Sequence, residues 1–355
     1  MTINQKNFIE KDATNVLKGF ALILMFVHHF FTFPDWYVDG VSYPYLLDFA
    51  EYMQGPSKIC VPIFAFLTGY FYYYSKEKNM RYSARKITDV WFTYLIVFLV
   101  LLVPAVLFSV YEFTLENLVL EILGLYTPTM FFCWYVIFYI TTMLVLPLYA
   151  KISERCCAFI LMVLSVIPTM IYYTLQPVLT GLASNLLTFA VSFVFFPCVG
   201  IGFIFAKYGL FFEFNNIIKT KNKALIILIG LGLIVLSMFP RLKFFDPGIE
   251  YNLPVSDAVC ATFFIFAVLL IYYNTSHKAI YKPIAIIGKY SLIMWFVHSL
   301  FFNQCKEFTQ PFLYLPKQPI LVLLWGLLIC FVISFVLQIP INYILKLKDK
   351  AFKLS

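Results

Sequence analysis

The segment Asn15-Val-Leu-Lys-Gly-Phe-Ala-Leu-Ile-Leu-Met-Phe-Val-His28-His29-Phe-Phe-Thr-Phe33 places two adjacent histidines inside an apolar run long enough to cross a membrane. Ionisable groups at membrane depth are costly, so they mark candidate functional sites. At about 100° per residue, Lys18 and His29 lie within roughly 20° of each other on one helix face, whereas His28 points elsewhere. With a rise of about 1.5 Å per residue, the His29 imidazole lies about 16 Å along the helix from Lys18.

The composition identifies a polytopic membrane protein. The chain of 355 residues is 62% hydrophobic, 20% aromatic and only 12% charged, and its mean hydropathy is +0.86. These values lie far from those of a soluble domain. Apolar stretches of about 18 residues or more predict transmembrane helices. We therefore expect an all-α transmembrane bundle of about ten spans, at roughly 15–33, 58–75, 88–110, 129–150, 156–176, 185–206, 224–240, 256–273, 290–306 and 318–343.

The distribution of basic residues predicts the orientation. An even number of spans puts both termini on one side, and Lys and Arg accumulate in cytoplasmic connections. With the N-terminus inside, most of the 26 basic residues fall in cytoplasmic segments, and the exceptions are Lys58, Arg241, Lys243, Lys306 and Lys317. We therefore expect an N-in, C-in protein. Membrane insertion and contact with anionic lipid explain the net charge of +8, so it does not indicate nucleic-acid binding.

The chain is predicted to be a single integral-membrane domain over residues 1–355. The segments between spans reach only about two dozen residues, which leaves no room for a soluble catalytic domain. The first apolar run has no small-residue cleavage site after it, so it is expected to remain as an anchor in the bilayer. Any chemistry must then use residues on helices and short loops. We predict neither a metal site nor a permanently bound cofactor.

The four histidines narrow the search for a site. His277 lies in a basic loop and is expected to be solvated surface. His298 lies inside the ninth predicted span, which runs in the same direction as the first, so the two spans bring their histidines to a similar depth. Ser291, Trp295 and His298 share one face of that span. A packing role, in which the imidazole bonds a neighbouring helix, is the alternative for His298 and the favoured interpretation of His28.

Five sequence blocks in a fixed order carry a family resemblance. They are Lys18-Gly-Phe-Ala followed by His29; Val61-Pro-Ile-Phe64-Ala-Phe-Leu-Thr68-Gly69-Tyr70; a basic loop that enters a span at Arg85-Lys86; Trp134-Tyr135; and Gly288-Lys-Tyr-Ser291-Leu-Ile-Met-Trp295-Phe-Val-His298. With these blocks the chain resembles the integral-membrane acyltransferase 3 family over nearly its whole length. The resemblance implies a multi-pass enzyme of the bacterial cytoplasmic membrane that moves an acetyl group from acyl-CoA to a surface polysaccharide.

The resemblance assigns roles to individual positions. His29 matches the family's first-span histidine, which is taken as essential, and Lys18 occupies a position usually held by arginine. In the family's paired-arginine motif, Lys86 matches the first arginine and Asp89 the second, which reverses a charge. Asp89 is four residues from Arg85 and is placed to pair with it on a helix.

The predicted chemistry requires a base and an acyl donor. An alcohol becomes an effective nucleophile only as its proton is removed, and an imidazole, with an ordinary pKa of about 6.5, suits this role. We therefore expect His29 and His298 to be the catalytic residues. Acetyl-CoA, or another acyl-CoA, is the expected donor substrate. Its phosphates are expected to bind a cytoplasmic basic cluster made of Lys18, Arg81, Arg85 and Lys86.

The acceptor, a surface or lipid-linked glycan, is expected to approach from the opposite side of the membrane. Aromatic faces and carboxylates together make a surface suited to a sugar, and the predicted substrate-binding residues are Asp35, Trp36, Trp134 and Trp295. The alternative is an aromatic belt at the membrane interface with solvated acids. The sequence leaves open the acceptor hydroxyl, the acyl chain length, the choice between direct transfer and an acyl-enzyme, and the oligomeric state.

Two other classes of protein fit parts of the pattern. A transporter of a glycan or a lipid-linked intermediate would also have about ten spans with ionisable residues near the midplane, but the sequence indicates neither an internal repeat nor paired broken spans. A bis-histidine haem protein would use His28 or His29 together with His298 as axial ligands. Both alternatives stay open at the level of the sequence.

Overall fold

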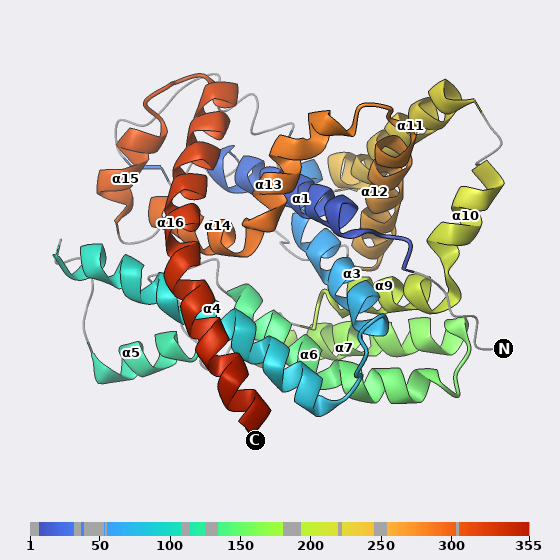
Figure 1. Ribbon diagram of the computed structural model, residues 1–355, viewed down its shortest axis with the longest axis horizontal. Coiled ribbons are helices and arrows are strands. Elements are labelled where there is room, and N and C mark those ends of the chain that lie inside the picture. The colour runs from blue at the N-terminus through green and yellow to red at the C-terminus, as the bar shows by residue number, and fades with distance from the viewer. Residues whose placement is uncertain are drawn as a thin grey trace.

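The computed structural model is a bundle of helices (Figure 1). It describes residues 7–31, 37–38, 53, 55–107, 114–124, 134–179, 193–218, 222–244, 254–302 and 305–354. Within these ranges every regular element is a helix, as the sequence predicts. The elements are α1 (Lys11–Phe31), α3 (Cys60–Tyr73), α4 (Met80–Leu107), α5 (Leu115–Ile122), α6 (Trp134–Ser153), α7 (Ala158–Leu179), α9 (Phe196–Tyr208), α10 (Leu210–Ile218), α11 (Lys223–Phe244), α12 (Pro254–Asn274), η3 (Lys278–Tyr281), α13 (Lys282–Lys289), α14 (Ser291–Val297), η4 (His298–Phe301), α15 (Lys306–Leu313) and α16 (Pro319–Leu354).

Several helices are long and apolar enough to cross a membrane. In the described part of the chain there are six such helices, or eight if each of two bent helix pairs forms one span, and α7 adds a shorter apolar stretch at Ala158–Thr174. Large apolar side chains on the outer faces of α11 and α16, among them Leu228, Val235, Leu324 and Val332, are exposed. Exposed apolar faces of this length suit contact with lipid. The protein is therefore a polytopic membrane bundle, and the ten spans and the N-in, C-in orientation stay predictions.

The structure has two bent helix pairs, and each bend lies at the edge of or just beyond a predicted span. The ninth span was expected at 290–306, but α13 begins at Lys282 and the chain bends by 57° at Tyr290, before α14. The α9 and α10 segments meet at 64°, where Gly209 adopts a φ of 62° and caps α9. The sequence analysis found no paired Gly/Pro-broken spans, whereas the structure has two bent helix pairs, each a broken span or a re-entrant loop. Hydropathy gives the length of an apolar run but contains no information on the direction of the helix axis.

Helix α1 lies at the centre of the bundle and packs closely on α13 (Figure 1). The two helices meet at glycines. A Cβ added at Gly19 would overlap the backbone carbonyl of Ile284, and a Cβ added at Gly288 would overlap the carbonyl of Asn15. Because small residues let helix backbones approach closely in a membrane, these two glycines set the position of α13, and of the α14 segment that follows it, against α1.

A second glycine crossing joins α3 to α9. A Cβ at Gly69 would overlap the carbonyl of Val199, and a Cβ at Gly202 would overlap the carbonyl of Phe66. Gly69 belongs to the Thr68-Gly69-Tyr70 block that the sequence analysis singled out. Helix packing is therefore one physical reason for the glycine in that block.

A buried ion pair ties α11 to α12. Nε of Arg241 donates to Oδ1 of Asp257 at 2.7 Å, Nη2 donates to Oδ2, and each side chain is only 2% exposed. The sequence analysis placed Arg241 outside the membrane-spanning segments, but α11 continues to Phe244 and carries this residue into the bundle. Loss of one partner from such a pair costs about 3–5 kcal/mol, because the other charge stays buried without compensation.

We predict that Gly288→Ala destabilises the protein by about 1–3 kcal/mol, since the new methyl group forces α13 away from α1. The matched control is Gly232→Ala on α11, where an added Cβ meets nothing within 4 Å and where alanine is the better helix former. The measurement is thermal unfolding of the two purified variants in detergent. Equal stability of Gly288→Ala and Gly232→Ala would show that the α1–α13 crossing does not constrain the fold.

Candidate active site

The two predicted catalytic histidines are in direct contact. Nδ1 of His29 on α1 lies 2.8 Å from Nε2 of His298 on η4, and the two ring planes are within 3° of parallel. His298 is completely buried, and the ring of Phe26 stacks on it with the centroids 5.5 Å apart. The sequence placed both imidazoles at a similar depth, and the structure brings them together.

A hydrogen bond to the backbone fixes which nitrogen of His298 carries a proton. Nδ1 of His298 contacts the carbonyl oxygen of Trp295. A carbonyl can only accept, so Nδ1 of His298 must donate, and in the neutral ring its Nε2 is then the acceptor. Nδ1 of His29 must therefore donate to His298, which makes Nε2 the unprotonated nitrogen of a neutral His29. An unprotonated imidazole nitrogen is able to accept a proton.

His28 faces a different set of neighbours. Its Nδ1 lies 3.5 Å from Oγ of Ser57, and its side chain is buried. Its ring centroid is 5.3 Å from that of His29. His28 and His29 therefore contact different residues, as their positions on different faces of the helix predict. The packing role of His28 stays a prediction.

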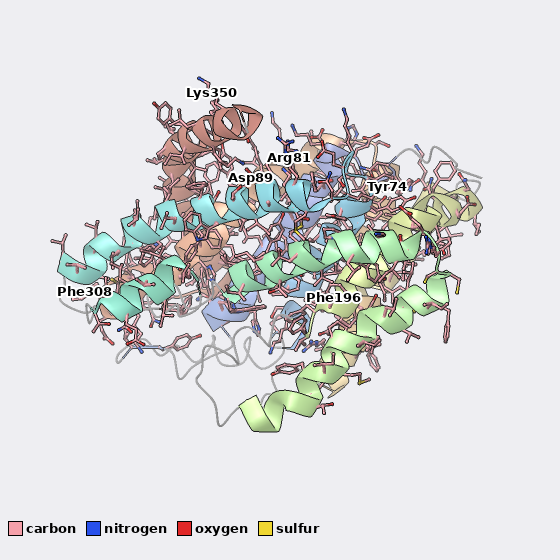
Figure 2. The ribbon with its side chains drawn as sticks, turned by 90° about the horizontal axis from the view of Figure 1, so that it is seen from below. Tyr74, Arg81, Asp89, Phe196, Phe308 and Lys350 are labelled. Atoms are coloured by element: carbon pink, nitrogen blue, oxygen red, sulfur yellow. The ribbon has the colours of Figure 1, made fainter. Side chains whose placement is uncertain are left out.

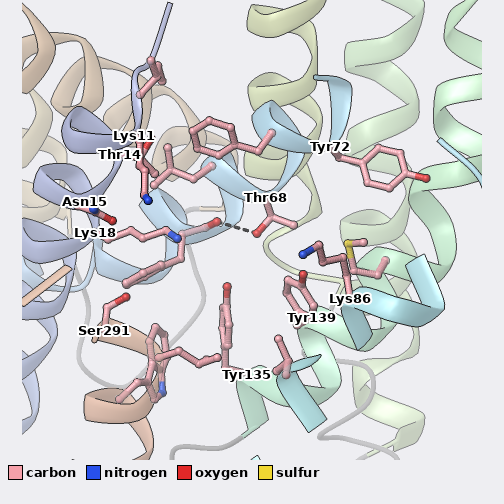
Figure 3. A pocket seen from close by; sticks show the side chains of 18 of the residues that line it. Lys11, Thr14, Asn15, Lys18, Thr68, Tyr72, Lys86, Tyr135, Tyr139 and Ser291 are labelled. Carbon is pink, nitrogen blue, oxygen red and sulfur yellow. Dashed lines mark hydrogen bonds between the residues drawn. The ribbon is translucent and has the colours of Figure 1, made fainter. Parts of the chain in front are cut away.

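A cavity of about 620 Å³ is lined by α1, α3, α4, α6 and α14 together with the residues that precede α1 (Figure 3). Neither histidine of the pair is among the described residues that line it. Its wall combines cations, hydroxyl and amide groups, and aromatic rings. The polar residues in the wall include Lys11, Asn15, Lys18, Thr68, Lys86, Tyr139 and Ser291.

The four predicted donor-binding cations divide into two pairs. Lys18 from α1 and Lys86 from α4 point into the cavity from opposite sides (Figure 3). Arg81 and Arg85 are exposed near the start of α4 and are not among the residues of the cavity wall. The guanidinium of Arg85 lies over the ring of Tyr82, 5.7 Å from its centroid. The arginines occupy a different face of α4 from Lys86 and do not line this cavity, and their predicted role in donor binding stays a prediction.

Asp89 has partners that the sequence analysis did not predict. It was expected to pair with Arg85, but its Oδ2 lies 3.3 Å from Nζ of Lys86, and its Oδ1 forms an ion pair with Nζ of Lys348 on α16. The acid that replaces a cation of the family motif therefore lies between two lysines. One of these lysines lines the cavity.

Trp295 connects the cavity to the histidine pair. Its side chain lines the cavity and packs on Tyr135, with ring centroids 4.5 Å apart, and on Phe64, with centroids 5.2 Å apart. Its carbonyl oxygen accepts a hydrogen bond from Nδ1 of His298. Ser291, one turn earlier on α14, lies in the same wall. The cavity and the imidazoles are thus separate features that share this one residue.

Trp134, another predicted substrate residue, is not among the described residues of this wall. Trp134 is half-buried and stacks on Phe195 with the ring centroids 5.7 Å apart. Asp35 and Trp36 lie outside the described residues. His277 is exposed, as predicted.

Sequence reasoning missed several members of the cavity wall. Asn15 lies three residues before Lys18 on the same helix face, so helical phase alone was sufficient to find it. No sequence pattern distinguished Tyr82 and Tyr139 from the other tyrosines, because the chain contains 25 of them. Lys348 is 259 residues from Asp89 in sequence, and no local pattern connects them.

The direct contact between the imidazoles argues against the haem alternative. Axial ligands on opposite faces of an iron, at roughly 2 Å each, have their nitrogens about 4 Å apart. The contact of 2.8 Å between His29 and His298 is too short to hold a metal between those two nitrogens.

These features define a membrane protein with a basic cavity and a pair of imidazoles in direct contact, both of which involve Trp295. The chain matches the family model described as an acyltransferase domain over residues 12–339. The chain belongs to this acyltransferase family, so it is a multi-pass membrane acyltransferase. No curated protein and no solved structure matches it. Family membership favours the enzyme over the transporter, even though the two bent helix pairs are a feature that transporters also have.

Proposed function

We propose that this protein transfers an acyl group, most simply acetyl, from acyl-CoA to a hydroxyl group of a surface or lipid-linked glycan. The observation that carries the proposal is the chain of hydrogen bonds from the Trp295 carbonyl through His298 to His29. It orients His29 so that Nε2 accepts the hydroxyl proton of the acceptor. In this scheme His29 is the general base and His298 positions it.

The proposed reaction is a direct transfer. Nε2 of His29 removes the proton of the hydroxyl group as its oxygen attacks the thioester carbonyl carbon. The tetrahedral intermediate collapses, the carbon–sulfur bond breaks, and the new oxygen ester leaves on the acceptor. The imidazolium then returns the proton to the thiolate, which gives free CoA and restores neutral His29. Proton transfer by a positioned side chain contributes about 10²–10⁴-fold in rate.

The cavity is proposed as the donor site. Phosphate groups are the anionic part of acyl-CoA, and the ammonium groups of Lys18 and Lys86, which face each other, supply the opposite charge. The pantetheine arm would run along the Ser291 and Trp295 wall toward the histidines. Lysine gives a point charge where the family usually has arginine, so phosphate contacts here are single bonds without the planar fork of a guanidinium.

The acceptor is proposed to reach His29 from the end of α1 that is distant from Lys18. His28 and Ser57 lie at this end. The segment with Asp35 and Trp36 follows directly in the sequence, and a sugar-binding role for these residues is retained as part of the proposal. A bacterial cytoplasmic membrane is the proposed location, because it brings a cytoplasmic thioester and an external glycan to opposite sides of one protein.

The direct test is transfer of labelled acetyl from acetyl-CoA to surface glycan in membranes, with mass spectrometry of the glycan from a strain that lacks the gene. We predict that His29→Ala lowers the transfer rate by about 10²-fold or more. His277→Ala, in the exposed loop, is the matched control and should leave the rate unchanged. Transfer by His29→Ala at the rate of the unaltered protein would refute the base, and an unaltered glycan in the deletion strain would refute the acceptor class.

His298 is expected to act through orientation. His298→Leu removes the acceptor for the Nδ1 proton of His29, so we predict a loss of roughly 10²-fold in kcat, since a base in the wrong tautomer is inactive. His298→Gln keeps an acceptor oxygen and should recover part of the rate. A glutamine variant as inactive as the leucine variant would contradict the proposed positioning role.

The cavity cations should govern donor affinity. Lys18→Met and Lys86→Met are each predicted to raise KM for acetyl-CoA by about tenfold, because each removes one charge-assisted contact to phosphate. The effect on kcat should be smaller. Lys346→Met, at an exposed position on α16, is the control. An unchanged KM in both cavity variants would mean that the phosphates bind elsewhere.

A further inference from the structure

The Asp89 carboxylate is shared by a cavity lysine and a lysine from the last helix. Lys86 reaches it from three residues away on α4, at 3.3 Å. Lys348 reaches it from α16, which crosses α4 (Figure 1). Figure 2 shows Asp89 on α4 below the end of α16 that bears Lys350. The Lys348 side chain is only 5% exposed, whereas that of Asp89 is 29% exposed.

Asp89 is in direct contact with a residue of the cavity wall. Its Oδ2 lies 3.3 Å from Nζ of Lys86, which lines the cavity. The described residues of the wall include three lysines and no acid. Asp89 is therefore the carboxylate next to an otherwise cationic site, and it opposes the binding of an anion there.

We propose that Lys348 is a positioning residue for the donor site: it neutralises Asp89, so that the Lys86 ammonium remains directed at the anionic groups of the thioester donor. The proposal rests on the acyl-CoA site proposed above. It assigns to the last helix the positive charge that the α4 motif lacks in sequence, where an acid occupies the position of an arginine.

Lys348 also contacts a second carboxylate, with its Nζ 3.2 Å from Oδ1 of the exposed Asp349. Lys86, Asp89, Lys348 and Asp349 together carry no net charge, and without Lys348 they carry one net negative charge. An ammonium group has three N–H donors, and the bond to Asp89 uses one of those of Lys86. With Lys348 present, the carboxylate is already paired and competes weakly for Lys86. With Lys348 removed, the carboxylate draws Lys86 toward itself and repels the phosphates of the donor.

The experiment measures the dissociation constants of acetyl-CoA and of S-acetylpantetheine, which lacks the nucleotide phosphates, on the purified full-length protein in detergent. We expect Lys348→Met to weaken acetyl-CoA binding by about tenfold and to leave S-acetylpantetheine binding unchanged. A merely structural role of Lys348 would weaken both ligands alike. The weakening should also shrink at high salt, because the effect is electrostatic.

The variant Asp89→Asn provides a second, independent test of the role of Lys348. Removing the carboxylate should tighten acetyl-CoA binding, and in the Asp89→Asn background Lys348→Met should have little further effect. This test holds even if Lys348→Met alone fails to fold, because the double variant has no carboxylate at position 89 and the Asp349 carboxylate is exposed to solvent. Lys350→Met, two residues further along α16 at an exposed position, is the matched control and should bind acetyl-CoA as the unaltered protein does.

The outcomes separate this inference from the proposed function. If the unaltered protein binds neither thioester, the donor assignment itself fails. If it binds acetyl-CoA but Lys348→Met binds equally well, or loses both ligands equally, the role of Lys348 is refuted while the donor site stands. A double variant as weak as a folded Lys348→Met, or an Asp89→Asn variant with no gain in affinity, would also overturn the inference.

Discussion

The close crossing of α1 and α13 is the constraint on which the site depends. Gly19 and Gly288 allow the two backbones to touch, with Ile284 and Asn15 as the opposing residues. Because α14 and η4 follow α13 after the bend at Tyr290, this contact also determines which residues of α1 lie next to α14 and η4. The result is that His298 meets His29 at hydrogen-bond distance. Side-chain chemistry at the site is thus a consequence of backbone proximity about ten residues away.

The bend at Tyr290 lets one short helix serve two purposes. Ser291 and the Trp295 side chain line the basic cavity, while the Trp295 carbonyl orients His298. A straight helix would continue past α1 along the axis of α13. The break redirects the chain, so that the cavity wall and the support for the base come from consecutive turns. In the proposed reaction the donor and the acceptor would approach from opposite sides, and a shared wall would serve both.

Part of this site was predictable from local rules. Helical phase grouped Lys18 with His29 and separated His28, and the spacing of Ser291, Trp295 and His298 indicated a second functional helix; the structure brings His29 and His298 into contact. The family resemblance rested on the same blocks, and the family model covers residues 12–339. The His29–His298 contact and the family were within reach of the sequence because each inference depends on residues within a few turns of one helix.

The remainder depends on pairings that no local pattern encodes. The expected Arg85–Asp89 pair followed from i, i+4 spacing, but Asp89 instead lies between Lys86 and Lys348. Arg81 and Arg85 were grouped with the cavity cations by proximity in sequence, although they lie on an exposed face of α4. The two helix breaks and the burial of Arg241 were missed because hydropathy fixes neither the direction of a helix nor the residue at which it ends.

The central claim is that the fold holds His29 as a neutral base with the proton on Nδ1 and the lone pair on Nε2. It is tested most directly by ¹⁵N NMR of the protein labelled at its four histidines, with His29→Ala and His298→Leu used to assign the ring signals. The account predicts that both His29 and His298 are protonated at Nδ1 and unprotonated at Nε2, and that His298→Leu removes this preference at His29. A His29 ring protonated at Nε2 in the unaltered protein would contradict the account, because that nitrogen could not then accept a proton from the acceptor.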